Sequence, residues 1–180
     1  MSDRTEGRYD FALLHEHGSG HSGAFESSLS VKHGIYRSGP MSAAMMVSGG
    51  ADKIYGSKPF YAVMLRAPLT VGDETIEATV SPWARKGFNE VVARELGVSP
   101  AVGIDAGFAL HLIERLDLLF ESRLDFSYGK DSNSPGLASG LEYRPLERAT
   151  LQLAFYEKPV GRGPAVGLVA VRAHIALAAL

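Results

Sequence analysis

Three histidines lie close together near the start of the chain, in the segment His15-Glu-His17-Gly-Ser-Gly-His21. Neutral imidazole groups at such a spacing can bind zinc, copper or nickel. His15 and His17 would share one face of a β-strand, because alternate strand residues point to the same side. The glycines would let His21 fold back toward them. The segment is therefore a candidate metal site, and a polar strand end followed by a glycine loop is the alternative.

Two further histidines, His111 and His174, belong to segments that also carry acidic and basic residues. A carboxylate beside a histidine can tune the imidazole as a general base. The sequence marks no serine as a nucleophile for either histidine, so an ordinary ion pair on a polar face is the alternative. Catalysis is accordingly a weaker expectation than a structural or binding role.

Several other kinds of chemistry are excluded by composition. The chain has no cysteine, which rules out disulfides and thiolate metal sites. Its net charge is −2 and no run of lysine or arginine stands out, which argues against nucleic-acid binding. The glycine-rich piece at 161–164 lacks the helix and lysine of a phosphate-binding loop. No cofactor is expected.

The elements that carry these residues are predicted to be β-strands. From Arg115 to Tyr128, apolar and polar residues alternate with a period of two, which is the period of a strand. The same pattern occurs in 102–113 and 165–177, and it is shorter in 137–144 and 150–155. Less regular strands are expected near 8–16, 24–37, 41–48, 59–67 and 75–80.

The connections between these segments alternate in length. Residues 113–115 and 145–148 make short turns, whereas 129–136 and 158–164 make longer polar loops. This alternation predicts an all-β domain over residues 1–180, an antiparallel up-and-down barrel of about 8–10 strands. The two long loops would lie at one end, where a partner would bind.

One short helix is expected near 82–96. Ser81 is a good N-cap, Pro82 fits the first helical position, and Gly97 can end the helix. Trp83 would then anchor this helix at a membrane interface. The alternative is a helix packed across one end of the barrel.

Strand length favours a barrel in a membrane. The segments 102–113, 115–128 and 165–177 contain 12, 14 and 13 residues. A tilted membrane strand needs about 9–11 residues, whereas most strands of soluble proteins have about 5–6. Apolar residues of such a strand face lipid and polar residues face the lumen. The predicted lumen-facing binding residues are Asp105, His111, Asp117, Glu121, Arg123, Asp125, Glu142, Arg144, Arg172 and His174.

The run from Gly140 to Phe155, followed by a polar loop and a final alternating strand, resembles Gram-negative outer-membrane β-barrel proteins. The resemblance extends over about residues 98–180 and concerns the pattern of residues, so it assigns no catalytic residue. It implies an outer-membrane location, contact with membrane lipid, and a structural or binding role. With about eight strands the lumen would be too full to conduct well, so a general porin is not expected. The oligomeric state stays open.

A soluble barrel is the alternative, because periodicity alone does not say which face is outside. Its interior would hold an apolar small molecule or lipid. The polar N-terminus is not a signal peptide, which fits this alternative; the membrane interpretation requires a leader that Met1 has replaced. A third interpretation is an enzyme that modifies envelope lipids. The soluble cavity would be lined by Phe108, Leu110, Phe120, Leu124, Phe126, Tyr143 and Phe155.

Overall fold

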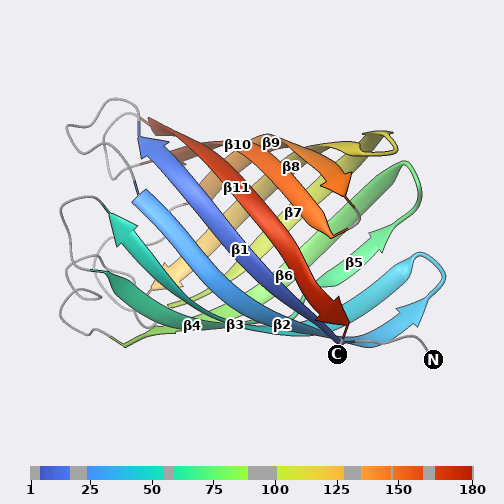
Figure 1. The fold of residues 1–180 in the computed structure, drawn as a ribbon, viewed down its shortest axis with the longest axis horizontal. Helices are drawn as coiled ribbons and strands as arrows, with labels where there is room; N and C mark the ends of the chain where they lie inside the picture. The colour runs from blue at the N-terminus through green and yellow to red at the C-terminus, as the bar shows by residue number, and fades with distance from the viewer. Residues whose placement is uncertain are drawn as a thin grey trace.

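The computed structural model describes residues 5–16, 24–54, 59–88, 101–127, 135–146, 148–159 and 165–179, which form eleven β-strands and their short turns (Figure 1). In chain order the strands are β1 Thr5–Glu16, β2 Ala24–Ser38, β3 Met41–Ile54, β4 Phe60–Arg66, β5 Leu69–Gly72, β6 Ile76–Gly87, β7 Ala101–Ile113, β8 Leu116–Ser127, β9 Pro135–Leu146, β10 Ala149–Pro159 and β11 Ala165–Ala179.

The strands form one closed antiparallel sheet. Consecutive strands pair with each other except β4 and β5, and β1 also pairs with β11, which closes the barrel. Strands β4 and β5 share a single position between β3 and β6: β4 pairs with residues 46–52 of β3, and β5 pairs with residues 41–43. The barrel therefore has ten strand positions, one of them interrupted, and the predicted up-and-down barrel is confirmed.

The interruption between β4 and β5 falls at Ala67 and Pro68. Proline cannot donate a hydrogen bond to a ladder, so a regular strand cannot continue through it. The wall stays bonded nevertheless, because the Ala67 N–H donates to the Pro82 carbonyl and the Ala44 N–H donates to the Pro68 carbonyl, both at 3.0 Å. Arg66 is the last residue before the break.

The described turns lie at one end of the barrel. Residues 39–40, 73–75 and 114–115 connect strands there, and β1 begins and β11 ends at the same end (Figure 1, right). We call this the short-turn end. Most of the two loops predicted to bind a partner, 129–136 and 158–164, lies outside the described residues. Residues 135–136 and 158–159 belong to β9 and β10 instead.

The predicted helix at 82–96 is wrong for residues 82–88, while 89–96 lie outside the described residues. Strand β6 runs through this region, with Ser81 and Trp83 buried and Pro82 and Ala84 exposed. Ser81 and Pro82 are typical of a helix start, but here Pro82 lies opposite the break between β4 and β5. No strand residue there needs a hydrogen bond from an N–H of residue 82, so proline is compatible with the strand. Among the described residues there is no helix long and apolar enough to span a membrane.

The outer face of the barrel is apolar. Phe108, Leu124 and Phe126 are 42%, 46% and 46% exposed, whereas Asp117, on the opposite face of β8, is 3% exposed. Phe108 and Phe120 stack on each other on this outer face, with ring centroids 4.7 Å apart. The soluble alternative is therefore wrong, because the side chains proposed to line its cavity point outward. An apolar face of this kind needs hydrocarbon around it.

Candidate functional site in the barrel lumen

The charged side chains of the long strands gather in the lumen, in two groups. The period of two puts every second residue of a strand on the inner side, so charges from neighbouring strands meet there. We call the first group the Arg–Trp cluster: Arg66, Trp83, Arg85, Asp105 and Arg123. We call the second group the His–Asp cluster: Arg8, Asp10, His111, Asp117, Glu142, Arg144 and His174.

Asp105 is the centre of the Arg–Trp cluster. Arg123, its cross-strand partner, donates from Nε to Oδ1 at 2.7 Å and from Nη2 to Oδ2 at 3.0 Å. Trp83 Nε1 also donates to Oδ1, at 2.9 Å. Arg66 Nη2 lies 3.9 Å from Oδ2. One carboxylate thus holds groups from β4, β6 and β8, and its bidentate arrangement with Arg123 is geometrically specific.

The Trp83 ring lies against two guanidinium groups. Arg123 and Arg85 are 5.6 Å and 5.8 Å from the ring centroid, within the range of cation–π attraction. Trp83 itself is 5% exposed. The ring therefore connects two arginines that stand on different strands.

Positive charge predominates at this level of the lumen. Arg123, Arg172, Asp105 and Glu121 all lie within electrostatic range of Arg66. Together with Arg85 this makes four arginines and two carboxylates among the residues described here. Of the predicted site residues, Asp105, Glu121, Arg123 and Arg172 are brought together, and the side chain of Asp125 is not described.

Asp117 is the centre of the second cluster. It accepts a hydrogen bond from Arg144 Nη2 at 2.6 Å, and its other oxygen lies 2.9 Å from His111 Nδ1. Only 5% of its side chain is exposed. A buried carboxylate is stable when charged or hydrogen-bonding partners surround it, and here one partner is permanently charged and the other is a histidine.

A second histidine–aspartate pair stands beside the first. His174 Nδ1 contacts Asp10, which also pairs with Arg8. Glu142 lies opposite Asp117 in the ladder and is in electrostatic range of His174. The His–Asp cluster thus takes its residues from β7, β8, β9, β11 and β1, and it brings together the predicted residues His111, Asp117, Glu142, Arg144 and His174.

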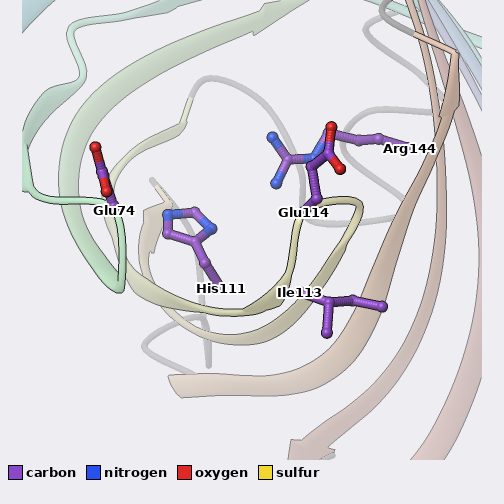
Figure 2. Close-up of a pocket in the computed structure, with 5 residues that line it drawn as sticks. All are labelled: Glu74, His111, Ile113, Glu114 and Arg144. Carbon is purple, nitrogen blue, oxygen red and sulfur yellow. The ribbon is translucent and has the colours of Figure 1, made fainter.

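The His–Asp cluster opens toward the short-turn end through a pocket of about 430 Å³. Figure 2 shows His111 between Glu74 on one side and Glu114 and Arg144 on the other. Glu74 comes from the turn at 73–75 and Glu114 from the turn at 114–115. Solvent therefore reaches His111 from the mouth of the barrel.

Sequence reasoning missed part of the lumen. Trp83 and Arg85 lie in the segment predicted as a helix, so their position in the lumen was not predicted, although both fit the period of two of β6. Arg66 lay in a predicted strand, and its polar position in an apolar run was the available signal. Glu114 lies in a predicted turn, and Glu74 lies between two predicted strands, so neither was predicted to be near the lumen.

Most of the predicted metal site lies outside the described residues. His15 lies on β1, but its side chain, His17 and His21 are outside the described part. Within the described part, no group of three histidine or acidic side chains is placed to hold a metal ion. The site at His15, His17 and His21 stays a prediction.

No protein-family model and no curated protein matches the sequence. Among solved structures, the chain is similar to a KdgM porin in complex with disordered oligogalacturonate, with a TM-score of 0.57 and 9% identity over 97% of this chain and 99% of that one. It is also similar to a NanC porin, with a TM-score of 0.54 and 9% identity over 95% and 97% of the two chains.

At such low identity the similarity concerns the fold. The chain has the fold of Gram-negative outer-membrane β-barrel proteins. Its apolar outer face is the surface that such a protein presents to lipid. The protein thus has the fold of an outer-membrane barrel, as the sequence pattern predicted.

Proposed function

We propose that this protein is a narrow outer-membrane channel that passes small hydrophilic solutes and favours anions. The observation that carries the proposal is the excess of arginine over carboxylate around Asp105. Fixed charges that line a pore raise the local concentration of ions of the opposite sign.

The width of the barrel supports conduction. The sequence argued against a general porin because about eight strands leave a lumen filled by side chains. Ten strand positions enclose a wider lumen, since barrel diameter grows with strand number. The lumen arginines also keep contact with solvent: 30% of the Arg66 side chain and 41% of the Arg123 side chain are exposed.

The similar structures support the same proposal. One of them is a porin in complex with disordered oligogalacturonate, so a barrel of this fold can admit a carboxylate-bearing solute. For this protein we propose only that small anions enter the lumen, and we do not propose oligogalacturonate as its ligand. A barrel with a structural role and no conduction is the competing outcome.

Reconstitution into planar lipid bilayers tests the proposal. The purified protein is inserted, a potassium chloride gradient is applied, and the reversal potential gives the permeability ratio of chloride to potassium. We expect single-channel conductance and a ratio above unity. Conductance no greater than that of the bare bilayer, or preference for potassium, would refute the proposal.

Arg66→Gln provides the charge test. Removing one unit charge about 10 Å from the permeating ions in water makes chloride about twofold less favoured and potassium about twofold more favoured, so the permeability ratio should fall about fourfold. Lys86→Gln is the matched control, because Lys86 is exposed and pairs with the outward-facing Val63, so it lies outside the lumen. The control should leave the ratio unchanged.

A further inference from the structure

Trp83 is unusual among the residues of the lumen. The buried apolar side chains of the described part are three alanines and this one tryptophan. Its neighbours in the lumen are charged or small, so it does not belong to an apolar core. A large buried ring in a polar lumen therefore requires a different explanation.

The wall of the barrel is shaped to receive the ring. Trp83 pairs with Gly103 across β6 and β7. A Cβ atom on Gly103 would lie 2.4 Å from Cζ2 and 2.6 Å from Cε2 of the Trp83 ring, which is closer than atoms can approach. The ring thus lies close against the β7 backbone at Gly103, where a Cβ atom would also lie 2.4 Å from the Leu124 carbonyl oxygen.

From this position the Trp83 ring contacts three charged groups of the Arg–Trp cluster. Its N–H donates to Asp105, which in turn binds Arg123 in a bidentate manner. Its face attracts Arg123 and Arg85. Free arginine side chains are long and have many rotamers, so a flat partner restricts where their charge stands.

We infer that Trp83 is a specificity-determining residue: seated on Gly103, it holds the guanidinium groups of Arg85 and Arg123 in place and so sets the anion preference of the channel. Trp83 carries no charge, so it acts through the arginines as a positioning residue. The inference rests on the proposed channel function and deepens it.

Trp83→Leu tests the inference, because it removes no charged group from the lumen. We expect the chloride-to-potassium permeability ratio to fall about two- to fivefold, the factor that one guanidinium–ring contact is worth. A ring that only filled space would give a different result: higher conductance with an unchanged ratio. That result would overturn the inference.

Two further variants sharpen this test. Trp83→Phe keeps a ring face and loses the N–H donor, so it should retain more of the preference than Trp83→Leu. Phe108→Leu is the matched control, since it removes an aromatic ring from the lipid-facing side of the neighbouring strand. An equal fall of the ratio in Phe108→Leu would also contradict the inference.

A measurement on the unmodified ring keeps the inference testable if the leucine variant does not assemble. Trp83 is the single tryptophan of the chain, so its fluorescence reports this site alone. Iodide should quench it more strongly than caesium, and Arg123→Gln should reduce that difference. Equal quenching by the two ions in the wild-type barrel would overturn the inference.

The two experiments separate failure of the inference from failure of the proposed function. A wild-type channel without chloride preference refutes the channel proposal. A chloride-selective wild type whose ratio is insensitive to Trp83→Leu refutes only the role of Trp83.

Discussion

The two clusters of the lumen are built on the same plan and differ in one partner. Each has a central aspartate that binds an arginine from a neighbouring strand: Asp105 binds Arg123, and Asp117 binds Arg144. The third member is Trp83 in the first cluster and His111 in the second. An indole keeps its charge state at all ordinary pH values, whereas an imidazole does not.

This difference suggests that the two clusters have different roles. The Arg–Trp cluster presents a fixed positive charge, which suits selection of ions by sign. The His–Asp cluster instead holds two histidines beside carboxylates. The cluster near the short-turn end also has the more deeply buried aspartate, since the side chain of Asp117 is 5% exposed and that of Asp105 is 24% exposed.

The largest expected effect concerns stability. Asp117→Ala removes the acceptor shared by Arg144 and His111, and we expect it to lower the free energy of unfolding by about 1–3 kcal/mol. Asp105→Ala should lower it less, because Asp105 is more exposed and water can replace it. Denaturant unfolding in detergent micelles, followed by circular dichroism and by heat-modifiable gel mobility, measures both. A larger loss of unfolding free energy in Asp105→Ala than in Asp117→Ala would contradict this prediction.

The smallest expected effect concerns the turn at residues 73–75, which is hydrogen-bonded to His111. Backbone N–H groups of Thr75 and Ile76 donate to the Asp73 carboxylate, at 2.7 Å and 3.1 Å, and lower its pKa. The Thr75 carbonyl in turn accepts the His111 N–H at 2.9 Å. The turn therefore ties β6 to the His–Asp cluster.

The sign of the pH effect follows from this lowered pKa. The folded state holds Asp73 ionised more strongly than the unfolded state does, so its contribution is present above about pH 4 and is lost as the pH falls further. Asp73→Asn should make unfolding slightly less pH-dependent between pH 6 and pH 3, measured by denaturant titration. The effect is small because this carboxylate is fully exposed. A steeper dependence in Asp73→Asn would contradict the assignment.

Much of the fold could be predicted from the sequence. The period of two from Leu116 to Phe126 depends only on local backbone geometry, so it identified β8 and placed Asp117 and Arg123 on one face. The alternation of short turns and long loops identified the antiparallel meander. The helix prediction failed because Ser81 and Pro82 fit the residue preferences of a helix start. The strand at Pro82 is instead stabilised by a residue about 15 positions earlier in the chain, since the Ala67 N–H donates to the Pro82 carbonyl.

The sequence by itself determined the strands, their alternating faces and the charges those faces carry, because these depend on neighbouring residues. Only the tertiary structure decided which face is outside and which charges meet. Asp10 and His174 are 164 residues apart and become neighbours because β1 closes the barrel against β11. Trp83 joins Arg123 through the register of β6, β7 and β8. Contacts of this kind depend on closure and register across the whole sheet, which no local pattern specifies.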